Sequence, residues 1–276
     1  MTYHSPMAAE TKVLALHCSG ASGRQWRRLQ EQAAGAIRVV APDLYGTASA
    51  GHWAGQHAIS LADEAERLLS LPELGRGRFH LVGHSYGGGV ALKLATMVPE
   101  RIASLTLYEP SAFHLLHAFG ARGRAAFGDI NRLATAVAEG LVSGAYRAGA
   151  ASFVEYWNGP GSWASMKPEV QAEMVRYLPK ACVDFRALFE EDTPLSVYRA
   201  LDIPMLVMVG ELAPAPTRVV AEALAAIVPG SAIRRIAGAG HMGAISHAGV
   251  VNESILAHIS QAATVTRQSA VPLQAA

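Results

Sequence analysis

The fold of this chain is decided by the stretch Phe79-His80-Leu81-Val82-Gly83-His84-Ser85-Tyr86-Gly87-Gly88-Gly89. Residues 79–82 form a short, mostly apolar run of the kind expected of a buried strand, and an apolar helical stretch begins at Val90. The pattern G-x-S-x-G lies between them. It is typical of a sharp strand-to-helix turn that holds a serine in strained backbone geometry at the top of a sheet. Ser85 is therefore a candidate nucleophile.

The same glycines allow two other interpretations. One is a chance glycine-rich turn. The other is a dinucleotide-binding loop, because Gly83, Ser85 and Gly88 occupy the three glycine positions of G-x-G-x-x-G, and Glu109 follows about 20 residues on, where an acid would bind a ribose. Ser85, however, replaces the glycine that lets a pyrophosphate approach the backbone, so the nucleotide interpretation is the weaker one.

Short apolar runs alternate with helix-length amphipathic stretches along most of the chain. The runs are bounded by Gly, Pro or Asp and lack strict alternation, as expected of strands buried on both faces of a parallel sheet. The pattern predicts an α/β fold with a doubly wound, mostly parallel sheet. The predicted strands cover residues 13–16, 37–41, 79–82, 102–107, 204–209 and 232–236, and the best helices cover 24–34, 61–71, 90–98, 219–227 and 250–259.

One long interval interrupts this alternation. Residues 111–200 contain no convincing strand, but they contain helical stretches at 130–139, 168–178 and 182–189 and an aromatic-rich connection at 156–163. An insertion of this kind between two sheet strands predicts a helical lid. The expected division is a core of residues 1–110 and 201–262, a lid of residues 111–200, and a flexible tail of residues 263–276.

Two further segments place polar groups after predicted strands. Gly240-His241 follows the last strand, at the edge where open α/β sheets bind their ligands. Histidine is the usual base for activating a serine because its pKa lies near working pH, although a lone histidine near a turn is often structural. After the first strand, His17-Cys18-Ser19 opens a small polar turn that is able to present backbone N–H groups to an oxyanion.

With these segments in place, residues 12–262 resemble the α/β-hydrolase superfamily. The chain has the segments of that superfamily in the same order. They are the polar turn at 17–19 (the oxyanion loop), Ala-Pro-Asp-Leu-Tyr-Gly at 41–46, the turn at Ser85 (the elbow), Leu-Tyr-Glu-Pro at 107–110, the lid and Gly240-His241. The resemblance implies a serine hydrolase with Ser85 as nucleophile, His241 as base, and an oxyanion hole formed by the N–H groups of Ser19 and Tyr86. The usual N-terminal hairpin is expected to be reduced, since few residues precede Lys12.

The chain departs from the superfamily at the acid that orients the histidine. The usual Asp would follow the penultimate strand, at the position of Ala213, and alanine cannot orient an imidazole. Glu109 is the leading replacement, because some relatives take their acid from the end of that strand. Glu211 is an alternative that needs a shifted loop, and a dyad without an acid is a third possibility. Asp184 and Glu155, both in the expected lid, are further candidates for this acid.

An apolar substrate pocket is expected between core and lid. Trp157 and Trp163 are the leading candidates for its walls, because their segment is aromatic, rich in Gly and Pro, and part of the lid. Met242, next to His241, is a third candidate. Cys18 is interpreted as a small residue in a tight loop rather than a reactive thiol. No Cys/His spacing indicates a metal, and no cofactor is expected.

Composition narrows the classes of partner. The chain has 276 residues, 51% of them hydrophobic, a formal net charge of +1 and two cysteines. No basic excess indicates nucleic acid, no apolar stretch is long enough for a membrane span, and no leader segment is recognised, so a cytoplasmic protein with a small-molecule substrate is expected. The pattern says nothing of the oligomeric state.

The expected activity is hydrolysis of an ester, or a similar acyl bond, of a small, largely apolar substrate through an acyl-enzyme. Two alternatives stay open. The same fold and triad also hydrolyse C–C bonds of β-diketone or ring-cleavage type, and some members of the superfamily keep a triad but serve as small-molecule receptors.

Overall fold

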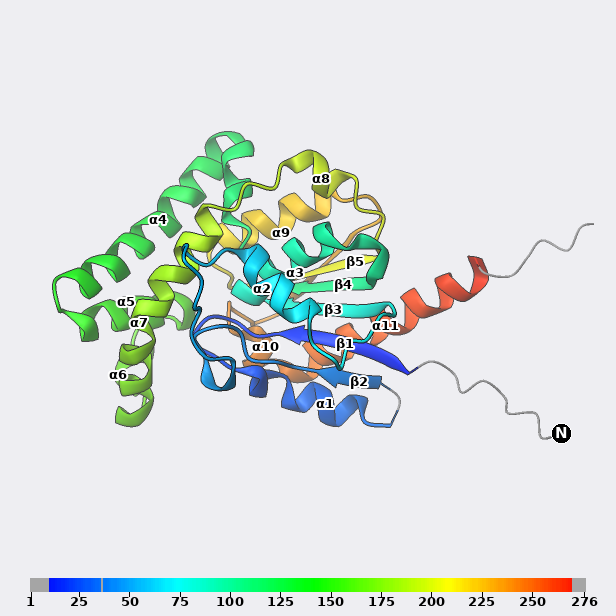
Figure 1. Cartoon of the computed structure of the whole chain (residues 1–276). Helices are drawn as coiled ribbons and strands as arrows, with labels where there is room; N and C mark the ends of the chain where they lie inside the picture. Colours follow the sequence, from blue (N-terminus) through cyan, green and yellow to red (C-terminus); the bar gives the residue numbers. More distant parts are fainter. Residues whose placement is uncertain (1–9, 36, 270–276) are drawn as a thin grey trace, which may run out of the picture.

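The computed structural model describes residues 10–35 and 37–269 and is built around one six-stranded β-sheet (Figure 1). The strands lie in the order β2-β1-β3-β4-β5-β6, and every pairing is parallel. The chain builds outward from β1 to β2 and then crosses to β3, so the direction of winding reverses between β1 and β3. The predicted doubly wound α/β fold is confirmed. The strands are β1 (Thr11–Leu16), β2 (Ile37–Val40), β3 (Phe79–His84), β4 (Ile102–Tyr108), β5 (Met205–Gly210) and β6 (Ala232–Ile236).

The central strands are buried and the edge strands are not. Every residue of β3 is buried, whereas four of the five residues of β6 are exposed. Two of these exposed residues are Arg234 and Arg235, and charged side chains on an edge strand oppose pairing with another chain. The apolar runs of the sequence therefore mark the middle of the sheet most clearly.

Helices cover both faces of the sheet (Figure 1). Buried side chains of α2, α3 and α9 form one apolar cluster, and those of α1 and α11 contribute to a second cluster on the opposite face. The sheet thus divides the core into two layers. The helices are α1 (Arg27–Ala33), α2 (Leu61–Leu69), α3 (Tyr86–Met97), α9 (Ala215–Ile227), α10 (Gly243–Ser246) and α11 (Ala248–Ser269), with short turns η1 (Gly23–Trp26), η2 (Ala48–Ala50) and η3 (Pro99–Arg101).

The interval between β4 and β5 is helical and contains no strand. In Figure 1 its helices α4 to α7 stand at the end of the sheet where the parallel strands finish. The elements are η4 (Phe113–Ala118), α4 (Gly120–Val142), α5 (Tyr146–Asn158), α6 (Ser162–Ser165), α7 (Pro168–Phe189) and α8 (Leu195–Arg199).

The prediction of two helices at 168–178 and 182–189 is wrong, because α7 is one helix that runs through Pro179. Proline removes one backbone donor from a helix interior. The buried face continues on both sides of it, with Leu178 and Ala181 followed by Phe185 and Leu188. Because tertiary packing of such a face supplies most helical stability, the helix tolerates the lost bond.

The segment from residue 263 was predicted to be a flexible tail, but α11 continues to Ser269, and neither Pro nor Gly interrupts residues 250–269. Residues 270–276 lie outside the described residues, as do residues 1–9, on which the predicted loss of the N-terminal hairpin depends. Within residues 10–35 and 37–269, no helix combines the length and hydropathy needed to cross a bilayer.

Candidate active site

Ser85 occupies the turn between β3 and α3, with φ 56° and ψ −119°. A non-glycine residue seldom adopts positive φ, and such strain is held only where the surroundings enforce it. The neighbouring glycines show why. A Cβ on Gly83 would lie 2.5 Å from the carbonyl oxygen of Gly87, and one on Gly87 would lie 2.4 Å from that of His17. The G-x-S-x-G pattern is thus a steric requirement of this turn.

The imidazole of His241 lies between Ser85 and Glu109. Its Nε2 is 2.9 Å from Ser85 Oγ, and its Nδ1 is 2.8 Å from Glu109 Oε2. The three side chains are buried, with residue exposures of 5% for Ser85, 3% for His241 and 0% for Glu109. A neutral imidazole that donates from Nδ1 to the carboxylate presents a free lone pair on Nε2 to the serine hydroxyl.

Glu109 is held in place from both neighbouring segments. It follows β4 with φ 42°. Among the described residues, Ser85 and Glu109 are the two non-glycine residues with positive φ. Its Oε1 accepts a hydrogen bond from Gly210 N–H at 2.9 Å, and its Oε2 accepts one from the Thr217 hydroxyl at 2.8 Å. With His241, the carboxylate has three donors, which fix its orientation toward the imidazole.

The other carboxylates that the sequence suggested lie elsewhere. Glu211 is exposed and accepts a hydrogen bond from Gly238 N–H. Glu155 accepts the N–H groups of Gly161 and Trp163, at the start of α6. Asp184 contacts Ser19 rather than His241. The position of Ala213 is buried and carries no carboxylate.

The loop after β1 packs directly on the elbow. Gly87 N–H donates to the carbonyl of His17 at 3.2 Å, so the backbone two residues before Ser19 is tied to the first turn of α3. Tyr86 opens α3, and the N–H groups of a helix's first turn have no intrahelical acceptor. Ser19 and Ser85 also line the same cavities. The Tyr86 side chain points away from them, toward Glu64.

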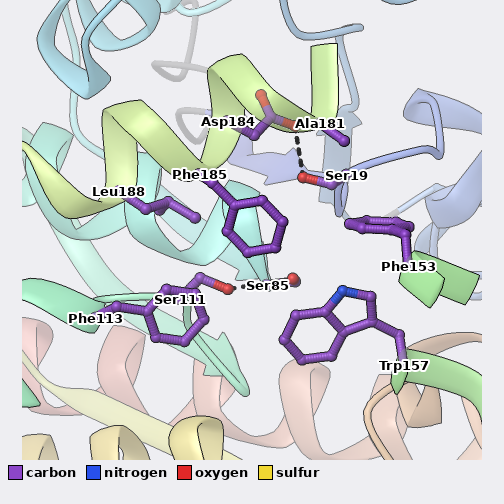
Figure 2. Close-up of a pocket in the computed structure, with 10 residues that line it drawn as sticks. All are labelled: Ser19, Ser85, Ser111, Phe113, Phe153, Trp157, Ala181, Asp184, Phe185 and Leu188. Atoms are coloured by element: carbon purple, nitrogen blue, oxygen red, sulfur yellow. Dashed lines mark hydrogen bonds between the residues drawn. The ribbon is translucent and has the colours of Figure 1, made fainter. Parts of the chain in front are cut away.

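Two cavities meet at Ser85. The smaller has a volume of about 10 Å³, and the larger has a volume of about 180 Å³. Both are lined by Ser19, Ser85, Phe153 and Trp157. Ser111, whose hydroxyl is 3.3 Å from Ser85 Oγ, lines the smaller one (Figure 2), whereas His241 lines the larger one.

The three predicted pocket residues have different positions. Trp157 lines both cavities, and its ring lies 4.1 Å from the His241 ring, centroid to centroid. Met242 lines the larger cavity. Trp163 lines neither of these two cavities and packs instead against the guanidinium of Arg147. The cause is the turn at 159–161, where two glycines with positive φ separate α6 from α5.

Within the described ranges, no group of three or more His, Cys, Asp or Glu side chains is arranged to hold a metal ion.

A comparison with protein families matches residues 13–254 to the alpha/beta hydrolase family. The chain belongs to this family. The parallel sheet and the strand–serine–helix turn described above fit that membership.

Individual relatives match a smaller part of this chain. It is 37% identical over 100 residues to the lipase LipV of Mycobacterium tuberculosis, a match that covers 36% of this chain and 37% of the lipase. It is 41% identical over 101 residues to the putative carbamate hydrolase RutD of Pantoea ananatis, covering 36% of each chain. The matches therefore span little more than a third of either relative. A solved hydrolase from Oleispira antarctica, 20% identical, shares the fold with a TM-score of 0.73 over 92% of each chain.

The site also contains a relay of hydrogen bonds that the sequence did not indicate. Cys18 N–H donates to Gln25 Oε1, Gln25 Nε2 donates to His84 Nδ1, and His84 Nε2 donates to the carbonyl of His241. Burial and the neighbouring His241 ring hold the pKa of His84 well below its usual value, so His84 is neutral and has one donor and one acceptor. The relay connects the loop after β1 to the histidine loop.

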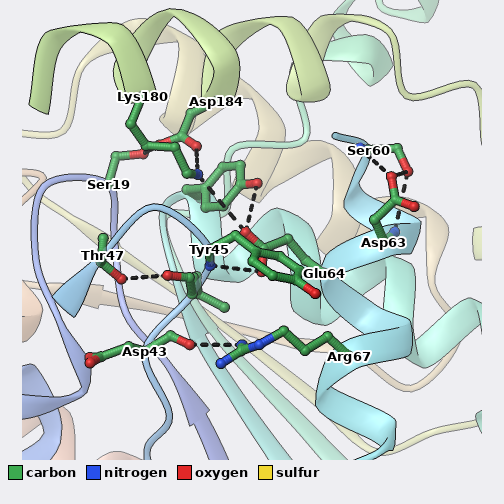
Figure 3. Close-up of polar contacts among 12 residues, drawn as sticks. Ser19, Asp43, Tyr45, Thr47, Ser60, Asp63, Glu64, Arg67, Lys180 and Asp184 are labelled. Atoms are coloured by element: carbon green, nitrogen blue, oxygen red, sulfur yellow. Dashed lines mark hydrogen bonds and ion pairs between the residues drawn. The ribbon is translucent and has the colours of Figure 1, made fainter. Parts of the chain in front are cut away.

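A second buried network joins α7 to the same loop (Figure 3). Asp184 accepts hydrogen bonds from the Ser19 hydroxyl at 2.6 Å, from the Tyr177 hydroxyl and from Lys180. Lys180 Nζ also lies 3.9 Å from Glu64 and 4.6 Å from the centroid of the Tyr86 ring. Burial raises the pKa of the Glu64 carboxyl, and the nearby Lys180 opposes that shift. The network links the helical interval to the elbow.

Cys18 lies in this loop as a buried thiol. Burial raises its pKa to about 12, so the nucleophilic thiolate is scarce near neutral pH. The structural role expected of Cys18 is consistent with this environment.

Other site residues were missed although the sequence contains a pattern for them. Phe153 lies four residues before the predicted Trp157 on α5, and Ala181, Phe185 and Leu188 lie on one face of α7. Helical periodicity identifies such faces but does not say what they cover. Gln25 has no sequence pattern that marks it.

Proposed function

We propose that this hydrolase is a carboxylesterase-like serine esterase that cleaves esters, or similar acyl bonds, of small, largely apolar molecules through an acyl-enzyme. The observation that carries the proposal is the line of hydrogen bonds from Ser85 through His241 to Glu109, at 2.9 Å and 2.8 Å. A hydroxyl, an imidazole and a buried carboxylate in this order are the groups that nucleophilic acyl transfer requires.

In the acylation step, His241 Nε2 takes the proton of the Ser85 hydroxyl while Oγ attacks the carbonyl carbon of the substrate. The carbonyl oxygen becomes an oxyanion, to which the N–H groups of Ser19 and Tyr86 donate. Glu109 holds the Nδ1 proton and stabilises the imidazolium. The bond to the leaving alcohol then breaks, and His241 Nε2 gives that alcohol its proton.

In the deacylation step, water attacks the acyl group on Ser85, and His241 Nε2 takes a proton from the water. The second tetrahedral intermediate breaks its bond to Oγ, and the proton on His241 returns to Ser85. The products are the carboxylic acid and the free enzyme. One water is consumed for each ester that is cleaved.

The surroundings suit this chemistry. The triad is buried, and interactions between an imidazolium and a carboxylate are stronger in a buried site than in water. Side chains of α5 and α7, including Phe153, Trp157 and Phe185, line the cavities beside Ser85. Residues 111–200 act in this proposal as a lid that excludes water and determines substrate choice.

The relatives agree with acyl-bond hydrolysis. One is named a lipase and another a putative carbamate hydrolase. Both names describe hydrolysis at a carbonyl carbon bearing a heteroatom, which supports an ester rather than a C–C bond as the substrate of this chain.

The test is steady-state turnover of p-nitrophenyl acetate by the wild type and by Ser85→Ala. We expect many turnovers for each wild-type molecule and a loss of at least about 10³-fold in kcat for the variant, with the far-ultraviolet circular dichroism unchanged. A wild-type protein that releases at most one p-nitrophenol per molecule would instead be a binding protein on this fold, and the proposal would be wrong.

A further inference from the structure

The two cavities at Ser85 differ in which catalytic group they contain. Ser85 lines both, but His241 lines only the larger cavity of about 180 Å³ and not the smaller one of about 10 Å³. The smaller cavity lies on the Ser111 side of the nucleophile, where the two hydroxyl oxygens are 3.3 Å apart (Figure 2). Ser85 is therefore placed between two spaces of unequal size.

Proton transfer decides which part of an ester occupies each space. His241 must give its proton to the leaving alcohol, so the alcohol oxygen has to lie beside Nε2, on the side of the larger cavity. The acyl group then extends into the smaller cavity. We infer that the preferred substrates are acetate esters of apolar alcohols about the size of one aromatic ring; this rests on the proposed esterase function.

The size of the smaller cavity limits the acyl group. A cavity of about 10 Å³ holds about one water-sized group, which matches the methyl group of an acetate but not a longer chain. Its walls are formed by well-packed side chains: Phe185 and Leu188 of α7 are only 6% and 3% exposed, and Phe113 is 0% exposed. Such walls yield little without a loss of packing.

The polar groups that line the smaller cavity disfavour binding of a negatively charged acyl chain. Asp184 lines it, but its carboxylate already accepts from Ser19, Tyr177 and Lys180. A carboxylate on the acyl chain would meet this negative charge in a buried space. Monoesters of dicarboxylic acids are therefore expected to be poor substrates.

The larger cavity suits an apolar leaving group. An apolar cavity of about 150 Å³ accommodates a benzene ring, so about 180 Å³ is sufficient for one ring or a comparable alkyl group. Three methionines line it, namely Met166, Met174 and Met242, together with Trp157. Methionine side chains adapt to ligands of different shape and contact aromatic rings favourably.

The experiment compares p-nitrophenyl acetate, butanoate and octanoate, which share one leaving group and differ only in the acyl chain. We expect kcat/KM to fall at least about tenfold from acetate to butanoate, and further for octanoate. A second pair, benzyl acetate and ethyl acetate, changes the alcohol at similar acidity, and the benzyl ester is expected to be preferred.

Two substitutions separate the cavities. Leu188→Ala widens the smaller cavity and should raise the butanoate-to-acetate ratio of kcat/KM by at least about fivefold. Met174→Ala widens the larger cavity and should leave that ratio within about twofold while changing the benzyl-to-ethyl ratio. If Leu188→Ala does not fold, Leu188→Val provides a smaller enlargement with the same expected direction.

The outcomes distinguish this inference from the proposed function. If Ser85 turns over no ester at all, the esterase function itself is wrong. If esters are turned over but butanoate and octanoate react as fast as acetate, the function stands and the assignment of the smaller cavity to the acyl group is overturned. A ratio that responds to Met174→Ala and not to Leu188→Ala also overturns it.

Discussion

Replacing Glu109 by Gln should prevent His241 from acting as a base while preserving the size of the side chain. The carboxylate is fully buried and accepts hydrogen bonds from Gly210 N–H, the Thr217 hydroxyl and His241 Nδ1. An amide offers one oxygen acceptor and one NH₂ donor, so one of the two oxygen positions must now present a donor.

Each orientation of the amide has a cost. With NH₂ at the Oε2 position, His241 Nδ1 becomes the acceptor, its proton moves to Nε2, and the ring can no longer take the proton of Ser85. With NH₂ at the Oε1 position, Gly210 N–H is left buried and unpaired, which costs about 1–3 kcal/mol of stability. In both cases the imidazolium loses its counter-charge. By analogy with neutralised triad acids elsewhere, kcat/KM falls about 10²–10⁴-fold, or about 2.7–5.4 kcal/mol of transition-state stabilisation.

The assay is kcat/KM for p-nitrophenyl acetate, measured well below the unfolding transition of each variant. The control is Glu211→Gln, which neutralises an exposed carboxylate that accepts from Gly238 N–H and should stay within about threefold of wild type. A folded Glu109→Gln variant that keeps more than about a third of wild-type activity would refute the role assigned to Glu109. So would a larger loss in the Glu211 variant.

Three further predictions concern Trp157, Asp184 and His80. Trp157→Ala, which removes a ring packed against that of His241, should alter the ranking of ester substrates, whereas Trp163→Ala, outside both cavities, should leave the ranking unchanged in the same kinetic panel. Asp184→Asn should lower the free energy of unfolding in urea by about 3 kcal/mol, because Lys180 loses its nearest buried partner; a loss below about 0.5 kcal/mol would contradict that role. Burial lowers the pKa of His80 from 6.5 to about 4, so its contribution to stability is complete above pH 6.5 and is lost as the pH falls toward 4. His80→Gln should therefore reduce the loss of unfolding free energy between pH 6.5 and 4 by about 1–3 kcal/mol, and an unchanged pH dependence would count against a neutral buried ring.

The sheet and the elbow were predictable because their determinants are local. Buried parallel strands are continuous apolar runs, and the turn at Ser85 has no room for a side chain at Gly83 or Gly87. The sequence also shows that Ala213 stands where the superfamily has its usual Asp, so another carboxylate, such as Glu109, was predicted to orient His241. All of these depend on residue type at a known place in the chain.

Features that depend on long-range packing were not predictable. Trp157 and Trp163 belong to the same aromatic segment, yet the helix break between them leaves one at the site and the other beside Arg147. The role of Gln25 depends on contacts with Cys18 and His84, and the latter is 59 residues away. The continuity of α7 through Pro179 likewise depends on what its buried face covers.

The most direct test of Ser85 as the nucleophile is its covalent labelling by a fluorophosphonate probe. Wild-type protein and Ser85→Ala are treated with the probe, digested, and mapped by mass spectrometry. We expect one modified peptide, with the adduct on Ser85, and no adduct in the variant. An adduct that persists on another serine such as Ser111 in the variant, or a wild-type protein that shows no adduct at all, would show that Ser85 is not the nucleophile.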